Sequence, residues 1–147
     1  MLVNQKIDPN AYDLSITVNT PKIDKSSTTL QDNLSYFVND QNLIGYQDGR
    51  QKVIALYDVI SIHTQDKKVI CETNQGNYRL KKRLYEIKSI LPQRVFIQVS
   101  SSEIVNFSCI QEFALTRNGI YQIIFKNGHT TYSSRRYMQK IKKEFLS

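Results

Sequence analysis

Apolar and polar residues follow two different periods along the chain, and the first fifty residues contain one example of each. From Tyr12 to Thr20 apolar side chains occupy every second position as far as Val18, which is the period of a half-buried strand, and Pro21 follows. Four apolar residues then recur at helical spacing: Leu30, Leu34, Phe37 and Val38. With Ser26 and Ser27 as candidate N-caps, this spacing predicts a helix over about residues 27–39.

From residue 42 onward, short apolar runs separated by turn residues predict a series of antiparallel strands. The predicted strands cover residues 42–46, 52–57, 59–64, 69–73, 95–99, 110–115 and 120–126, with a last one running through Tyr132. The predicted turns are Gln47–Arg50, Gln65–Lys68, Asn74–Asn77, Arg117–Gly119 and Asn127-Gly128, of which the last is the strongest hairpin signal. The run Ser100-Ser101-Ser102 does not continue the strand before it, so a further turn is expected there.

Two more segments have helical periodicity. Leu80, Leu84, Ile87 and Leu91 are spaced by four, three and four residues, which predicts one face of a helix that Pro92 ends. The last helix begins at Ser133-Ser134, and its apolar stripe is formed by Tyr137, Ile141 and Phe145. The chain is therefore expected to be mainly β, an α+β fold of short antiparallel strands with three short helices.

The charge of the chain is unevenly distributed. Residues 1–50 contain four lysines or arginines and six aspartates, a net charge of −2, whereas residues 51–147 contain sixteen basic and seven acidic residues, a net charge of +9. The net charge of +7 therefore belongs to the later part of the chain. This asymmetry favours a polyanion-binding module preceded by a segment with another role, although a charge of this size also fits an ordinary solvated surface.

Residues that could support catalysis or metal binding are few and scattered. Cys71 and Cys109 lie far apart, each beside an isoleucine, which is typical of small core residues in a reducing compartment. His63 and His129 have no acidic residue or cysteine at ligand spacing, and the chain has no glycine-rich phosphate loop. We expect no enzymatic activity, no cofactor and no metal site. The chain has no signal-peptide or membrane-spanning run, so a cytoplasmic protein is expected.

The most distinctive segments lie in the later part of the chain and follow one another in a fixed order. Asp58-Val59-Ile60 and Gly76-Asn77-Tyr78-Arg79 precede the predicted helix from Leu80 to Leu91, and residues 96–106 read Phe-Ile-Gln-Val-Ser-Ser-Ser-Glu-Ile-Val-Asn. Asn127-Gly128 and Ser133-Ser134-Arg135-Arg136-Tyr137 come next. In this order and spacing, residues 51–147 resemble the LytTR family of bacterial DNA-binding domains.

The resemblance implies an elongated, mainly β domain of a transcriptional regulator, which reads double-stranded DNA with two inter-strand loops and the start of its last helix. Carried over to this chain, the contact positions are Lys67, Lys68, Ser100, Ser101, Arg135 and Arg136. The family often has His at the position of Ser100 and Lys or Arg at that of Ser101, so the serine loop has less cationic reach here. Glu103 also replaces a common aromatic residue.

The residue types at these positions suit DNA recognition independently of the family. An arginine donates two hydrogen bonds to a guanine edge, a lysine neutralises phosphate, and a helix that begins at Ser134 directs its backbone N–H groups at the same place. The alternative is that Arg135 and Arg136 only cover the sheet with their aliphatic stems. Three further basic residues are either additional phosphate contacts or a solvated helix face: Lys81, Lys82 and Arg83.

Two parts of the chain are expected to have different roles. Residues 51–147 form the LytTR-like DNA-binding domain, and residues 1–50 form a β-α-β extension that packs on it or mediates self-association as a homodimer. Fifty residues are too few for the receiver domain that many relatives carry, so a stand-alone regulator is expected. A membrane-bound regulatory partner is implied only at the level of the family. Two other functions stay open, an RNA-binding β module and a protein-interaction module with an acidic partner.

Overall fold

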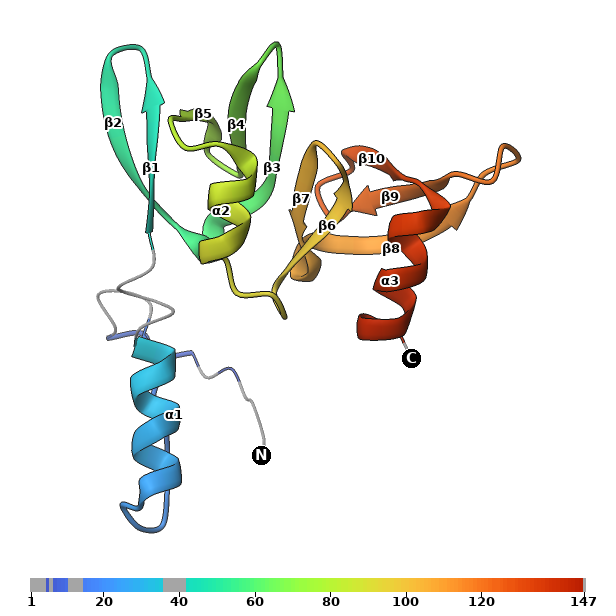
Figure 1. Cartoon of the computed structure of the whole chain (residues 1–147). Helices are drawn as coiled ribbons and strands as arrows, with labels where there is room; N and C mark the ends of the chain where they lie inside the picture. Colours follow the sequence, from blue (N-terminus) through green and yellow to red (C-terminus); the bar gives the residue numbers. More distant parts are fainter. Residues whose placement is uncertain (1–4, 6, 11–14, 36–41, 147) are drawn as a thin grey trace.

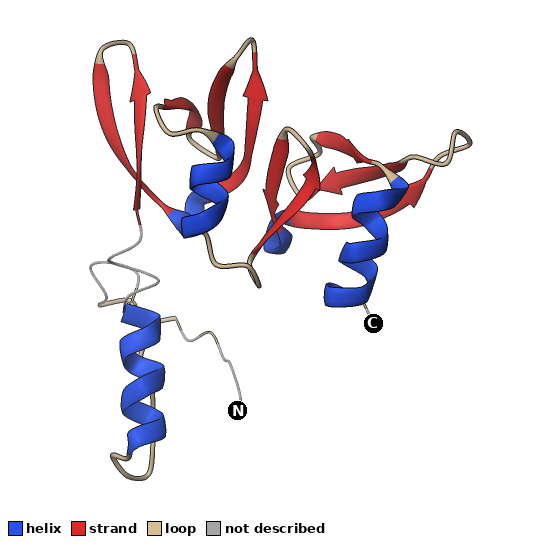
Figure 2. Cartoon of the chain, viewed as in Figure 1, coloured by secondary structure: helices blue, strands red, loops and turns tan. Residues whose placement is uncertain are grey.

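The structure is a computed structural model that describes residues 5, 7–10, 15–35 and 42–146. Short antiparallel strands dominate this part of the chain, together with three α-helices (Figure 1; Figure 2). In chain order the elements are α1 (Lys25–Ser35), β1 (Asn42–Gln47), β2 (Arg50–Ala55), β3 (Val59–Gln65), β4 (Lys68–Thr73), β5 (Gly76–Leu80), α2 (Leu84–Ile90), β6 (Phe96–Ser100), β7 (Glu103–Asn106), β8 (Ile110–Leu115), β9 (Tyr121–Phe125), β10 (Thr130–Ser133) and α3 (Arg135–Phe145).

The described strands form two antiparallel sheets. The larger has seven strands in the order β2-β1-β5-β4-β3-β7-β6, and the smaller has three in the order β10-β9-β8. Several neighbours in space are also neighbours in sequence, because tight turns fold a strand back on its predecessor. At one such turn Asp48 has a φ of 49° and Gly49 a φ of 74°, the left-handed values that a two-residue hairpin turn requires. The predicted mainly β, α+β class is confirmed.

The larger sheet and helix α2 enclose the first hydrophobic core. Side chains alternate along β5, so that Tyr78 and Leu80 are buried while Asn77 and Arg79 are exposed. Ile87 of α2 is completely buried against this layer. Because burial of apolar surface is the dominant favourable term in folding, this core holds α2 on the sheet.

The second core lies between the β6–β7 edge of the larger sheet, the smaller sheet and helix α3. Val99 and Val105 contribute from the larger sheet, Ile123 from β9, and Met138 and Ile141 from α3, each with an exposed fraction of 2% or less. Since both sheets share this core, α3 is fixed beside β6 (Figure 1). Helix α3 is thereby attached to the larger sheet through Met138 and Ile141.

The helix predicted from Leu80 to Leu91 is wrong in its first turn. Leu80 is the last residue of β5, where it pairs with Val69 of β4, and α2 begins only at Leu84. The helical spacing arises because Leu80 and Ile87 are buried in the same core, although they belong to different elements. The predicted turn at Asn74–Asn77 therefore leads into a fifth strand and not directly into a helix.

The boundary of α2 also changes the surroundings of the basic residues before it. The backbone N–H of Arg83 donates to the Glu86 carboxylate at 2.7 Å, which caps the helix at this point. Lys81 and Lys82 consequently lie in a bend between β5 and α2, not on the exposed face of a helix.

The N-terminal segment agrees with the predicted helix but not with the predicted strand. Residues 15–20 of the strand predicted over Tyr12–Thr20 belong to neither sheet, because no described strand pairs with their backbone, and residues 12–14 lie outside the described residues. Helix α1 covers Lys25–Ser35, and residues 36–39 of its predicted range also lie outside. The helix begins earlier than predicted because Asp24 Oδ1 accepts the backbone N–H of Ser27 at 2.8 Å.

The division of the chain at residue 50 stays a prediction. Strand β1 lies before that position, pairs with both β2 and β5, and buries Leu43 in the first core. Helix α1 stands apart from both sheets in Figure 1 and has no fully buried residue. The larger sheet of the described structure thus begins at Asn42.

Candidate nucleic-acid interface

The turn between β3 and β4, here called the lysine turn (residues 65–68), presents Lys67 and Lys68. Asp66 and Lys67 have φ values of 49° and 63°, as in a two-residue hairpin turn. Both lysines are exposed, and neither forms an ion pair with a described residue. With Asp66 between them and Gln65, the two lysines leave the turn with a net charge of +1 and form no ion pair in the described structure.

The turn between β6 and β7, here called the serine turn (residues 100–103), lies beside the lysine turn. The backbone N–H of Thr64 donates to the carbonyl oxygen of Ser102 at 2.8 Å, which joins the end of β3 to this turn. Ser100 is half-buried, and its Oγ accepts the backbone N–H of Ser102 at 3.2 Å. Ser101 is exposed at the tip. Of the two predicted contact residues, Ser101 presents its side chain to solvent and Ser100 supports the turn.

The start of helix α3 carries the third pair of predicted contact residues. Ser134 occupies the N-cap position, but its side chain makes no capping hydrogen bond, so the first backbone N–H groups stay available to an anion. Arg135 and Arg136 follow and are both exposed. Arg135 Nε donates to the carbonyl oxygen of Gly119 at 3.2 Å, whereas Arg136 makes no ion pair within the described part of the chain.

Gly119 supports the Arg135 side chain, a role that the sequence analysis did not predict. The glycine is buried and has a φ of 75°, and a Cβ atom at this position would lie 2.4 Å from the Arg135 guanidinium, so a larger residue would displace the Arg135 side chain. The signal Arg117-Asn118-Gly119 predicts the turn between β8 and β9 correctly. It gives no indication that this turn meets the first residue of α3.

Glu103 connects the base of the serine turn to the smaller sheet. Thr131 Oγ1 of β10 donates a hydrogen bond to Glu103 Oε2. Burial raises the pKa of the Glu103 carboxyl and Glu72 adds to the rise, while hydrogen bonds from Thr131 and Ser61 and the charge of His63 oppose it. Because β10 leads directly into α3, this contact ties the serine turn to the strand that precedes Arg135 and Arg136.

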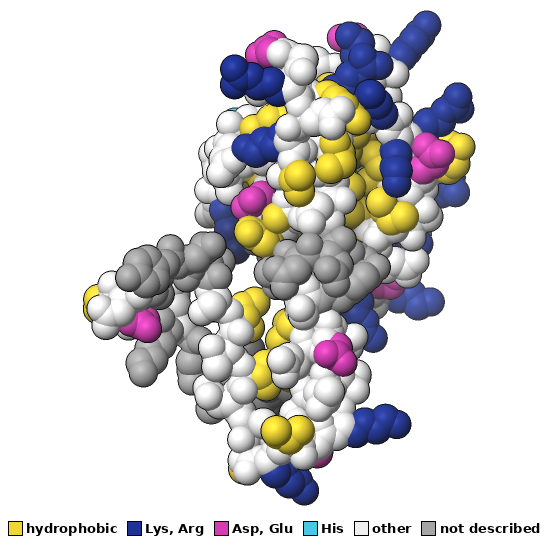
Figure 3. All heavy atoms as spheres, turned by 90° about the vertical axis from the view of Figure 1, so that its left-hand side faces the viewer, with side chains coloured by type: hydrophobic (Ala, Val, Ile, Leu, Met, Phe, Trp, Pro, Cys, Tyr) yellow, Lys and Arg dark blue, Asp and Glu magenta, His cyan; other side chains and the backbone are white. Residues whose placement is uncertain are grey.

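The three further basic residues predicted as phosphate contacts have different surroundings. Lys81 Nζ lies 4.2 Å from the centre of the Tyr46 ring, a cation–π contact that holds it against β1. Lys82 and Arg83 are exposed. Figure 3, which views the molecule from the left-hand side of Figure 1, shows lysine and arginine side chains gathered toward the upper end, where the strand turns lie. On this face, basic side chains are therefore most frequent toward the end of the molecule that carries the lysine turn.

The described residues contain no metal-binding cluster and no reactive thiol. No group of three or more His, Cys, Asp or Glu side chains among the described residues could hold a metal ion. Burial raises the pKa of the Cys71 thiol to about 12, and burial also raises that of Cys109, so both stay protonated at neutral pH. Neither α1, α2 nor α3 is long and apolar enough to cross a membrane.

The described fold and its polar turns match a known family. The LytTr DNA-binding domain family covers residues 49–145, a range that includes the lysine turn, the serine turn and α3. The chain belongs to the LytTR family. The resemblance predicted over residues 51–147 is confirmed.

Relatives of the LytTR chain include two HTH-type transcriptional regulators of Staphylococcus aureus. The protein of strain bovine RF122 / ET3-1 is 36% identical and that of strain NCTC 8325 / PS 47 is 35% identical, each over 142 residues. The alignments cover 97% of this chain and 96% of each relative, so they include most of the residues before the family match. In the described part of the LytTR chain, strands separate successive helices, so no helix-turn-helix is present there.

A solved structure shares the fold of the LytTR chain. A LytTr DNA-binding domain from Bacillus cereus matches with a TM-score of 0.66 at 20% sequence identity. The match covers 69% of this chain and 94% of that domain. The arrangement of short antiparallel strands and helices is therefore the fold of this family.

Proposed function

We propose that the LytTR chain binds a specific site on double-stranded DNA and so regulates transcription, reading the duplex with the lysine turn, the serine turn and the start of α3. One observation carries the proposal: hydrogen bonds from Thr64 to Ser102 and from Thr131 to Glu103 tie these three elements together, although they are far apart in sequence. Their cations have no acidic partner among the described residues. A duplex offers phosphates to the lysines and base edges to the arginines.

The residue types favour a different task for each element. Arg136, which has no described partner, suits two parallel hydrogen bonds to a guanine in the major groove. Lys67 and Lys68 neutralise phosphates and do not distinguish base sequences. Ser101 offers only a hydroxyl, so the serine turn contributes less charge than it does in many relatives. The N–H groups at the start of α3 bind a further phosphate.

The N-terminal residues suit a role in assembly. Leu30 and Leu34 of α1 are half-buried, so part of the apolar stripe of this helix is left to be covered. In this proposal the part of residues 1–50 that precedes β1 joins two chains, and the homodimer binds two half-sites about one helical turn apart. Such a regulator acts in the bacterial cytoplasm. A membrane-bound regulatory partner is added only by analogy with the family.

Fluorescence anisotropy tests the proposal with three probes. They are a duplex selected from a random pool by the purified protein, a random duplex of the same length, and a single-stranded RNA. We expect the selected duplex to bind most tightly, with log K falling by about 0.9 per neutralised phosphate and about four to six phosphates per chain. Tighter binding to the RNA, or an affinity that does not change with salt, would overturn the proposal.

A further inference from the structure

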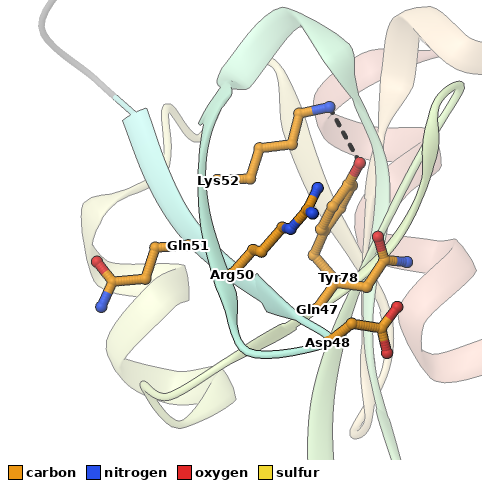
Figure 4. A pocket seen from close by; sticks show the side chains of 6 residues that line it. All are labelled: Gln47, Asp48, Arg50, Gln51, Lys52 and Tyr78. Atoms are coloured by element: carbon orange, nitrogen blue, oxygen red, sulfur yellow. Dashed lines mark hydrogen bonds between the residues drawn. The ribbon is translucent and has the colours of Figure 1, made fainter.

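A pocket of about 620 Å³ lies at the β1–β2 turn, outside the three elements proposed to read the duplex (Figure 4). Its lining residues are Gln47, Asp48, Arg50, Gln51, Lys52 and Tyr78. They come from the end of β1, the turn, β2 and the middle of β5. All of these side chains carry a hydrogen-bonding group, and two are cations, so the pocket suits a charged ligand.

Lys52 is held in a defined position at this pocket. Its Nζ lies 3.0 Å from the Tyr78 hydroxyl and 5.0 Å from the centre of the Tyr78 ring, and it also donates to Gln75 Oε1. These partners are neutral, so they orient the ammonium group without cancelling its charge. A cation that is already ordered loses little conformational entropy when an anion binds to it.

Arg50 provides a second cation on the same side of β2. Because side chains alternate along a strand, Arg50 and Lys52 both point toward Tyr78, whereas Gln51 points away (Figure 4). Arg50 is exposed and forms no ion pair with a described residue. Asp48 is the carboxylate of the pocket, and it lies at the end opposite Lys52 (Figure 4). The Arg50–Lys52 end therefore has two uncompensated positive charges.

The position of the pocket relates it to DNA. The β1–β2 turn lies at the same upper end of the molecule as the lysine turn (Figure 1), where basic side chains gather (Figure 3). Gln47 and Asp48 precede residue 49, where the family match begins, so this pocket is partly built from residues outside that match. We propose that Arg50 and Lys52 bind a backbone phosphate in the DNA that flanks the recognised site. The inference rests on the proposed DNA binding of this chain.

Two duplexes distinguish a contact with flanking DNA from a contact with the recognised site. One contains the selected site alone, and the other contains the same site extended by about ten base pairs at each end. Arg50→Ala should weaken binding to the extended duplex several-fold and reduce its salt slope by about 0.9, with no change on the short duplex. Lys52→Gln should act in the same direction. Asp48→Asn removes the carboxylate and keeps a residue that tolerates the left-handed backbone, so it should strengthen binding to the extended duplex.

Arg94→Ala is the matched control, because Arg94 is an exposed arginine in the connection between α2 and β6, which lies below the strands in Figure 1, whereas the β1–β2 turn lies above them. It should bind both duplexes as the unmodified chain does, and thermal unfolding should show that every variant is folded. Equal losses on both duplexes, or no loss on the extended duplex with Arg50→Ala and Lys52→Gln, would overturn the flank contact while the proposed function stands. Failure of the unmodified chain to bind any duplex would overturn both.

Discussion

His129 and Glu72 join the two sheets: His129 Nδ1 lies 2.6 Å from Glu72 Oε1, a hydrogen bond that becomes an ion pair when the imidazole is protonated. His129 lies in the β9–β10 turn, and Glu72 lies on β4 of the larger sheet. Ser61 Oγ on β3 also lies 3.4 Å from Glu72 Oε2. Among the described residues this is the one ion pair, so it is the charged link between the sheet of the lysine turn and the sheet that leads into α3.

Removing this contact should loosen the attachment of the smaller sheet. His129→Ala and Glu72→Gln should each destabilise the chain, with a coupling free energy of about 0.2–1 kcal/mol in a double-mutant cycle. We expect the lower part of that range because the His129 side chain is 67% exposed. Urea unfolding measures the cycle, and Thr130→Ala, at an exposed position of the same hairpin, is the control. Strictly additive effects of the two substitutions would show that the contact contributes nothing.

The stability of the chain should depend on pH through Glu103. Burial raises the pKa of this carboxyl above its ordinary value of 4.5, so the folded protein holds the proton more tightly than the unfolded chain does. The stabilisation is therefore complete below the unfolded pKa and is lost as the pH rises from 4.5 through the folded pKa. Glu103→Gln, which resembles the neutral acid, should not show this loss.

Thermal unfolding of both proteins over a series of pH values measures the effect of Glu103. The melting temperature of the unmodified chain minus that of Glu103→Gln should fall as the pH rises through this window, while the contributions of other carboxylates cancel in the difference. A difference that stays constant or grows with pH would contradict the raised pKa.

The start of α3 should affect site preference, whereas the lysine turn should not. Arg136→Ala should cost about 1–3 kcal/mol on the selected duplex and relax its preference at one base pair. Lys67→Ala should weaken selected and random duplexes alike. Arg135→Ala should also remove the hydrogen bond that Arg135 Nε donates to the carbonyl oxygen of Gly119.

Arg136→Lys is the matched control for this comparison, because it keeps the charge but cannot donate two parallel hydrogen bonds. It should keep most of the affinity for random duplex and lose site preference. If both Arg135→Ala and Arg136→Ala bind with unchanged affinity and preference, the helix-start assignment is wrong.

A cation in the serine turn should strengthen DNA binding. Ser101 is exposed at the tip of the turn, so Ser101→Arg introduces a charge without displacing a buried group. We expect tighter binding to both selected and random duplexes and a steeper salt dependence by about 0.9, since one more phosphate is neutralised. Gln111→Arg, at an exposed position of β8, adds the same charge elsewhere. Equal binding by Ser101→Arg and the unmodified chain would show that the serine turn does not reach the duplex.

Two truncations should separate the first strand from the segment before it. Removing residues 1–41 leaves both sheets complete, so the melting temperature should change little. Removing residues 1–50 also deletes β1, which buries Leu43 and packs Gly45 closely against Ile54 and Tyr78. Losing a buried leucine side chain costs about 2–5 kcal/mol, so this protein should unfold at a clearly lower temperature. Equal melting temperatures for the two truncations would contradict a structural role for β1.

The protein that lacks residues 1–41 allows a second measurement, its size in solution compared with that of the full chain. If residues 1–41 mediate self-association, the full chain should be a dimer that prefers paired half-sites, and the truncated chain a monomer that does not. A monomeric full chain that binds paired and single half-sites equally would remove the dimer from the proposal.

The local elements of this protein follow from its sequence because they depend on residues that are near one another in the chain. Strand β8 covers Ile110–Leu115 as predicted, and the hairpin turns at Asp48-Gly49 and Asn127-Gly128 fall where their residues indicate. Gly, Asn and Asp adopt the positive φ angles of these turns at little energetic cost, and the periodicity of a strand or helix is visible within a few residues. The same locality applies to the short motifs from which the LytTR resemblance was predicted.

Only the tertiary structure decided which elements meet. Leu80 has helical spacing with Leu84, yet it belongs to β5 because its backbone pairs with Val69, and the spacing records only burial in a shared core. No period or turn signal specifies the contact of Arg135 with Gly119 or that of His129 with Glu72. These pairs form because the second core packs α3 and the smaller sheet against the larger one, and each polar group then bonds to the partner that packing has brought within reach.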